Sequence, residues 1–220
     1  ISSPQYVWAL FTKPIMGQLG VTLTELQVTF SILIVLQTFF SPFQGYLVDK
    51  FGPRLLLSIG TILTGLSWVL SANLTTVSNL YITYGVLGGL GTGIVYIGVV
   101  GLMVRWFPNN RGFAVGMVAA GYGIGALLTT FPISTSLAES GLQGTLTFFG
   151  YLIGAVGLLA AQGIRVPHAD RVQTAGQIEA AASGVAPKTM LKTPVFWLMF
   201  LMMSMMSTSG LMVISQMGAF

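Results

Sequence analysis

Long apolar runs with very few charges between them constrain this chain more than any other feature. A helix needs about 20 apolar residues to cross the core of a bilayer, and several such runs follow one another here. Charged residues make up only 6% of the 220 residues, against roughly 25% in a soluble domain. The 54% hydrophobic content excludes a disordered chain, and the runs are too long for barrel strands. We therefore predict an all-α protein embedded in a lipid bilayer.

Seven segments are expected to form membrane helices. Their approximate bounds are 1–12, which resembles the second half of a helix, then 25–48, 55–72, 80–104, 112–134, 144–164 and 194–220. Thr22 and Glu25 have the spacing of a capping box at the start of the second segment. Thr193 and Pro194 predict the N-cap and first turn of the seventh.

Basic residues lie almost entirely on one side of these segments. The loops after the second, fourth and sixth segments hold Lys50, Arg54, Arg105, Arg111, Arg165, Arg171, Lys188 and Lys192, and the other side holds only Lys13. Cytoplasmic loops carry such an excess, so the even-numbered segments are expected to end in the cytoplasm. The basic residues form no soluble face, and no nucleic-acid partner is expected.

The longest loop divides the chain by composition. Residues 166–193 are mostly polar or small, and we expect them to form a cytoplasmic linker. It would separate a six-helix unit, 1–165, from a helix at 194–220 that begins a second unit.

Glycines at four-residue spacing predict close helix packing. Such glycines let membrane helices pack backbone to backbone. They occur at Gly85, Gly89 and Gly93 in the fourth segment, and as the pairs Gly112 with Gly116 and Gly121 with Gly125 in the fifth.

The loop between the second and third segments carries the most specific motif, G-x-L-x-D-K-x-G-x-R. Gly45 is expected to allow a neighbouring helix to approach, and Gly52 to permit a sharp turn. Asp49 is expected to pair with Arg54 or to cap a neighbouring helix, and Lys50 completes the motif. The pattern resembles the signature loop of the major facilitator superfamily.

Further stretches resemble one branch of that superfamily, the oxalate/formate antiporters, which neighbour the monocarboxylate transporters. They are "SPQYVWALFTKP", "LQTFFSPFQGYLVDKFGPR", "GVLGGLGTGIVY", "RWFPNNRG" and "AAGYGIGALLTTFPI". The resemblance implies a helical bundle of twelve helices. This chain would then hold the N-terminal six and the first helix of a second half that is mostly missing. It also implies alternating access, with small carboxylates exchanged at a central site.

The depth of polar residues along the predicted helices indicates a candidate binding site. Tyr96 and Tyr122 lie nine residues before Arg105 and eleven after Arg111, which places them roughly 13 and 16 Å from the cytoplasmic edge. The midplane of the bilayer lies at about 15 Å, where transporters bind substrates. Gln5 lies roughly 12 Å from the outer side, and tyrosine hydroxyls and glutamine amides can donate to a carboxylate.

The resemblance supports the same positions. In the oxalate/formate branch, matching positions on the first, fourth and fifth helices line the substrate cavity. Carried over to this sequence, they are Gln5, Tyr96 and Tyr122, with Tyr6 and Trp8 as further candidates.

The motif residues are expected to act as a conformational latch. Gly45 and Asp49 lie toward the cytoplasmic end, roughly 12 and 18 Å from Gln37 and the midplane. A contact there can act only by favouring one global conformation. Lys50, Gly52 and Arg54 are assigned to the same latch.

Missing residue types matter as well. No predicted span has a charged residue or histidine at its middle. A dianion held only by neutral donors would lose much of its hydration energy, so the compensating cations are expected in the missing half. With no cysteine and one histidine, His168 in the linker, neither a metal site nor a catalytic triad is expected, and no cofactor.

The sequence therefore predicts part of a secondary carrier, not an enzyme, in a bacterial inner membrane. It would exchange small carboxylate anions, with oxalate and formate as the leading pair. The alternatives are a proton-coupled monocarboxylate carrier, although this half lacks an intramembrane carboxylate for a proton relay, and a non-transporting membrane scaffold.

Overall fold

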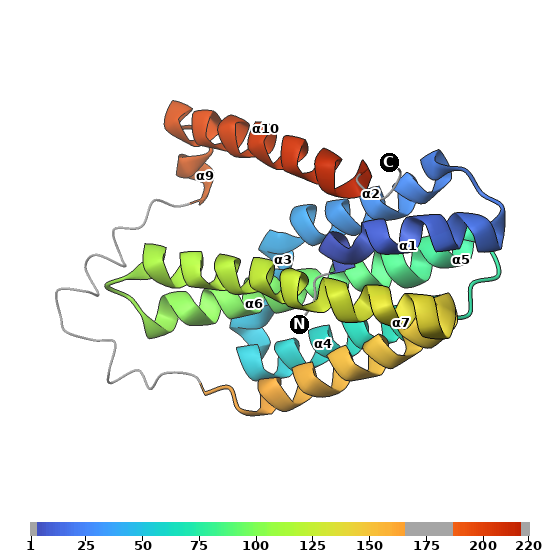
Figure 1. The fold of residues 1–220 in the computed structure, drawn as a ribbon. Helices are drawn as coiled ribbons and strands as arrows, with labels where there is room; N and C mark the ends of the chain where they lie inside the picture. The colour runs from blue at the N-terminus through green and yellow to red at the C-terminus, as the bar shows by residue number, and fades with distance from the viewer. Residues whose placement is uncertain (1–3, 166–186, 217–220) are drawn as a thin grey trace.

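The structure, a computed structural model, describes residues 4–165 and 187–216, and this part of the chain contains helices and no β-strand (Figure 1). The helices are α1 (Pro4–Leu19), α2 (Leu23–Phe39), α3 (Ser41–Phe51), α4 (Pro53–Ser71), α5 (Val77–Leu80), the π-helical η1 (Tyr81–Leu87), α6 (Gly88–Trp106), α7 (Arg111–Gln162), α9 (Pro187–Met190) and α10 (Pro194–Gln216). The predicted all-α class is confirmed. Most of the predicted linker, 166–186, lies outside the described residues.

The second predicted segment is a bent pair of helices. The capping box at its start is present: the Thr22 hydroxyl accepts from the Glu25 backbone N–H, and the Glu25 carboxylate accepts from the Thr22 N–H at 2.8 Å. The axes of α2 and α3 differ by 52°. Pro42 lies in the first turn of α3, and proline cannot donate to the preceding turn and its ring crowds the carbonyl there. We attribute the bend to this proline.

The fifth and sixth predicted segments are the two arms of α7. A straight helix of its 52 residues would be about 78 Å long, more than twice the thickness of a bilayer core. Instead the chain reverses at Gly141, whose φ of 69° and ψ of −175° are not helical, and the two arms run in opposite directions (Figure 1). A positive φ costs glycine little, which explains the residue at this turn.

Several described helices are long and apolar enough to cross a membrane. They are α4, the continuous stretch Val77–Trp106, α7 and Pro194–Val213 of α10, and the bent pair of α2 and α3 adds a fifth if it forms one span. The first helix, α1, begins at Pro4 and extends to Leu19, further than the sequence predicted.

Close backbone contacts hold α4 against its two neighbours. A Cβ atom added to Gly91 of α6 would lie 2.7 Å from the Thr64 nitrogen and 2.9 Å from the Gly60 carbonyl oxygen, both in α4. A Cβ added to Gly65 on α4 would lie 2.8 Å from the Gly150 carbonyl oxygen of α7. At these points only glycine permits the observed helix separation.

The glycine pattern of the fourth segment is confirmed. A Cβ on Gly85 would lie 3.1 Å from Ile32 Cγ2, and one on Gly89 would lie 2.8 Å from the Leu33 carbonyl oxygen. A Cβ on Gly93 would lie 2.6 Å from the side-chain oxygen Oε1 of Gln44 in α3. The fifth segment differs: within the described residues, nothing lies within 4 Å of a Cβ placed on Gly112, Gly116 or Gly121. These three glycines therefore do not make the predicted close helix contacts with any described residue.

Aromatic side chains fill the core between α1, α4 and η1. Trp8 packs against Tyr84, with ring centroids 5.0 Å apart, and Phe11 meets Trp68 edge-on at 5.4 Å. The Tyr84 hydroxyl donates to the Pro4 carbonyl oxygen at 2.9 Å, which ties the start of α1 to η1.

Gly91→Ala tests the backbone contact between α6 and α4. The added methyl group must push the two helices apart, and overpacking of this kind costs typically about 1–3 kcal/mol. We expect a lower melting temperature in detergent for the protein encoded by the complete open reading frame. Gly101→Ala is the matched control on the same helix, because no atom lies within 4 Å of its Cβ position. Equal stability of the two variants would contradict the packing role of Gly91.

Candidate functional site

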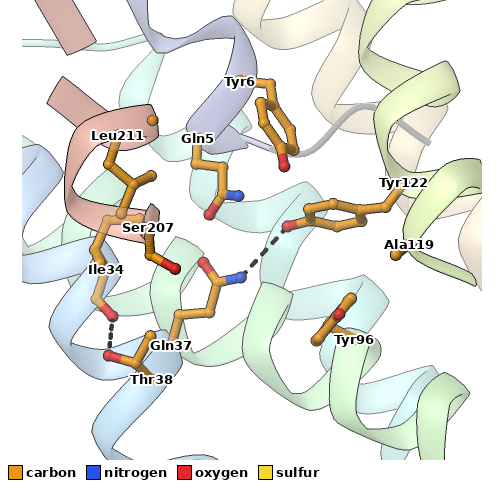
Figure 2. Close-up of a pocket in the computed structure, with 11 residues that line it drawn as sticks. Gln5, Tyr6, Ile34, Gln37, Thr38, Tyr96, Ala119, Tyr122, Ser207 and Leu211 are labelled. Carbon is orange, nitrogen blue, oxygen red and sulfur yellow. Dashed lines mark hydrogen bonds between the residues drawn. The ribbon is translucent and has the colours of Figure 1, made fainter. Parts of the chain in front are cut away.

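A cavity of about 400 Å³ opens between the N-terminal helices and α10 (Figure 2). Its size falls within the range of small-molecule pockets, about 300–1,000 Å³. The lining side chains come from α1, α2, α6, α7 and α10. They are Gln5, Tyr6, Ile34, Gln37, Thr38, Tyr96, Ala119, Tyr122, Ser207, Gly210 and Leu211.

Three tyrosines form one wall of the cavity. The ring of Tyr122 lies 5.3 Å from that of Tyr96 and 5.5 Å from that of Tyr6, measured between centroids. Tyr96 and Tyr122 belong to α6 and α7, which meet through the short loop after Trp106. Similar distances from that loop predicted a similar depth for the two residues, and the structure places their rings side by side. The tilted and edge-on geometries are those that aromatic pairs prefer.

Gln37 is a cavity residue that the sequence analysis used only as a depth marker. Its Nε2 atom donates to the Tyr122 hydroxyl at 3.4 Å, a long hydrogen bond (Figure 2). Its Oε1 atom is buried and has no hydrogen-bond partner among the residues that the structure describes. Gln37 lies twelve residues from both Glu25 and Asp49 at the ends of the second segment, so the depth argument applied to the tyrosines would have found it.

Thr38 and Gln5 also contribute polar side chains to the cavity wall. The Thr38 hydroxyl donates to the Ile34 carbonyl oxygen of its own helix at 2.7 Å. Gln5 is 8% exposed, and its side chain lies between Tyr6 and Gln37 in Figure 2. None of the described residues that line the cavity is charged. The cavity thus offers hydroxyl and amide groups to a ligand, with no counter-ion.

Trp8 does not join the other four predicted residues. It is fully buried in the aromatic core, where it packs against Phe30 and Tyr84. Gln5 and Trp8 are three residues apart on one helix, so they share neighbouring rather than identical faces. Trp8 was predicted as a further cavity residue, but it does not line this cavity.

The signature loop forms a second polar site at the end of α3. Gly52 adopts a φ of 87° between α3 and α4, which confirms the predicted sharp turn. The approach at Gly45 is looser, because a Cβ there would lie 3.7 Å from Ile97 Cγ2, an ordinary contact. The Lys50 ammonium lies 5.9 Å from the Tyr46 ring centroid and 5.5 Å from that of Phe51.

Of the two arrangements predicted for Asp49, the ion pair with Arg54 is wrong. Its carboxylate forms an ion pair with the Arg105 guanidinium at the end of α6. Arg54 turns the other way and donates from Nε and Nη2 to Gln162 Oε1, at 3.1 and 2.8 Å. Proximity in sequence suggested Asp49 with Arg54, but the sharp turn at Gly52 directs the two side chains to different helices.

Within residues 4–165 and 187–216, no group of three or more histidine, cysteine, aspartate or glutamate residues could hold a metal ion.

Comparisons with known proteins agree with the helical architecture. The sequence profile of the Major Facilitator Superfamily matches residues 5–219. The oxalate:formate antiporter of Oxalobacter formigenes is 35% identical over 215 residues, which are 98% of this chain and 51% of that protein. YhjX of Escherichia coli K12, an uncharacterized MFS-type transporter, is 27% identical over 210 residues, 95% of this chain and 52% of that protein.

A shorter similarity extends to monocarboxylate transporters. Mouse monocarboxylate transporter 14 is 36% identical over 111 residues, which are 50% of this chain and 22% of that protein. The chain spans about half the length of the two relatives it matches from end to end. Because the superfamily profile covers nearly the whole chain, and a relative above 30% identity covers 98% of it, the chain belongs to the Major Facilitator Superfamily.

Proposed function

We propose that this chain is part of a secondary carrier that exchanges small carboxylate anions across a bacterial inner membrane by alternating access. Oxalate and formate are the leading pair, because the Oxalobacter relative that covers 98% of the chain is an oxalate:formate antiporter. The observation that carries the proposal is the neutral cavity, whose tyrosine hydroxyls and glutamine amides converge from four N-terminal helices.

The chemistry of the cavity suits a small anion only in part. Hydroxyl and amide N–H groups can donate to a carboxylate, but the cavity wall described here carries no positive charge. We propose that the cations come from a second half of the carrier, beyond this chain, and that 166–193 links the halves on the cytoplasmic side. The eight-to-one distribution of basic residues supports that orientation.

A proton-coupled monocarboxylate carrier is the second candidate. The similarity to monocarboxylate transporters favours it, although it covers only half of this chain. The sequence beyond this chain would discriminate, because an aspartate next to an arginine inside a membrane helix would favour proton coupling.

Exchange in liposomes tests the proposed function. The protein encoded by the complete open reading frame is reconstituted, preloaded with labelled oxalate, and challenged with external formate, oxalate, lactate or malonate. We expect efflux that depends on the external anion. Absence of exchange with all four would overturn the proposal and favour a non-transporting scaffold.

Tyr96→Phe and Tyr122→Phe test the binding role of the two hydroxyls. Phenylalanine keeps the tilted and edge-on ring contacts and removes only the hydroxyl. A hydrogen bond to a charged group contributes about 1.5–3 kcal/mol, so we expect a roughly ten- to hundredfold loss of affinity for each direct contact. Unchanged affinity with a lowered melting temperature would instead assign the hydroxyls to helix packing. Tyr151→Phe is the matched control, because that tyrosine is 65% exposed and does not line the cavity.

Asp49→Asn tests the proposed latch. The ion pair with Arg105 is partly exposed, at 67% for Asp49 and 42% for Arg105, and such pairs contribute about 1 kcal/mol or less. The change should therefore alter the exchange rate by at most roughly fivefold, with little effect on substrate affinity or melting temperature. Glu139→Gln, an exposed acid on α7, is the control. A loss of affinity without a change in exchange rate at saturating substrate would contradict the latch.

A further inference from the structure

A second cavity, of about 410 Å³, lies between the start of α4 and the end of α7, at the end of the bundle where the basic residues gather. Its described lining combines a single charged side chain with polar and apolar neighbours. The lining residues are Phe51, Gly52, Pro53, Arg54, Leu55, Ser58 and Gln162. The two cavities have no lining residue in common, and the proposed exchange of carboxylates makes no use of this one.

The guanidinium of Arg54 is oriented at this cavity, and no described carboxylate neutralises it. Its Nε and Nη2 atoms donate to Gln162 Oε1. Gln162 Nε2 donates in turn to Ser58 Oγ at 3.2 Å, and that hydroxyl donates to the Arg54 carbonyl oxygen at 2.8 Å. These bonds leave three of the five guanidinium N–H groups without a partner among the described residues. The nearby carboxylate of Asp49 is paired with Arg105 instead.

An exposed apolar stripe begins at the same cavity and follows α4 along its length. Its residues are spaced by three or four positions, so they share one face of the helix, and each is between 41% and 53% exposed. They are Leu55, Ile59, Ile62, Leu66 and Leu70. Figure 1 shows α4 and the second arm of α7 on the side of the bundle away from α10. The proposed second half begins with α10, so lipid rather than that half is the expected neighbour of the stripe.

We infer that this cavity binds the headgroup of an anionic phospholipid, in the membrane leaflet at the basic end of the bundle, which is the cytoplasmic leaflet in the proposed orientation. A guanidinium presents its donors in a planar fork that matches the oxygens of a phosphate. The Lys50 ammonium, 5.5 Å from the ring centroid of the lining residue Phe51, adds a second positive charge. The acyl chains would lie along the stripe on α4.

The charge of the lining favours an anionic lipid over a zwitterionic one. None of the described residues that line the cavity is acidic, so the ammonium group of a zwitterionic headgroup meets no opposite charge on this wall. Basic pockets between membrane helices bind anionic headgroups in this way. The stripe favours a lipid over a soluble phosphate, because only a lipid covers exposed apolar side chains while its phosphate reaches Arg54.

Binding of single lipid molecules tests the inference. The protein encoded by the complete open reading frame is purified in detergent and titrated with dioleoyl phosphatidylglycerol, dioleoyl phosphatidylcholine or sn-glycerol 3-phosphate, and native mass spectrometry counts the molecules bound. We expect phosphatidylglycerol to bind at least about fivefold more tightly than phosphatidylcholine, the factor that one basic residue near an anionic surface contributes. Glycerol 3-phosphate should bind far more weakly than either lipid. Arg54→Gln should remove the preference for phosphatidylglycerol.

Arg111→Gln is the matched control, because it removes the same charge at the same end of the bundle from a side chain that does not line the cavity. It should keep the preference. Equal loss in both variants would indicate a general attraction between charges, and retention of the preference in Arg54→Gln would place the lipid elsewhere; either result overturns the inference.

The wild type alone also decides the matter, without any variant that has to fold. The inference is wrong if phosphatidylglycerol and phosphatidylcholine bind equally, or if glycerol 3-phosphate binds as tightly as the lipid, which would make the cavity a site for a soluble phosphate. Lipid binding is measured without a transported anion, so a failure of carboxylate exchange would overturn the proposed function and leave this result unaffected.

Discussion

The close approach of α4 to α6 and α7 is the constraint on which the rest of the bundle depends. In lipid, apolar side chains gain little by leaving their surroundings, so helices associate through packing and interhelical hydrogen bonds. Gly91 against Thr64, and Gly65 against Gly150, let the backbones meet at distances that any Cβ atom would prevent. The contact with Gly150 positions the second arm of α7, after the reversal at Gly141. Tyr122 lies on the first arm, and its ring centroid is 5.3 Å from that of Tyr96 on α6.

None of the described residues that line the cavity next to these tyrosines is charged, and this limits how these side chains can bind an anion. Hydroxyl and amide groups can orient a ligand through directional hydrogen bonds. An anion that leaves water, however, loses hydration energy that neutral donors replace only in part. The chain spans about half the length of the two relatives that it matches from end to end.

The signature loop is connected to the same helices. Asp49 links the end of α3 to the end of α6 through Arg105, and Arg54 links the start of α4 to the end of α7 through Gln162. Both contacts lie at helix ends, and none of their residues belongs to the aromatic core around Trp8 and Tyr84. A conformational change that separates α3 from α6 has to break the ion pair, whereas the core packing can persist.

The sequence by itself determined the helical class, the approximate spans, the capping box at Thr22 and the turn at Gly52, because apolar run length, local capping and glycine geometry are properties of short segments. It also predicted the depth of Tyr96 and Tyr122, since helix rise converts sequence separation into distance. Only the tertiary structure decided which faces meet. It placed Trp8 in the core rather than the cavity, paired Asp49 with Arg105 rather than Arg54, and brought Gln37 to Tyr122. These outcomes depend on helix rotation and crossing geometry, which no single segment encodes.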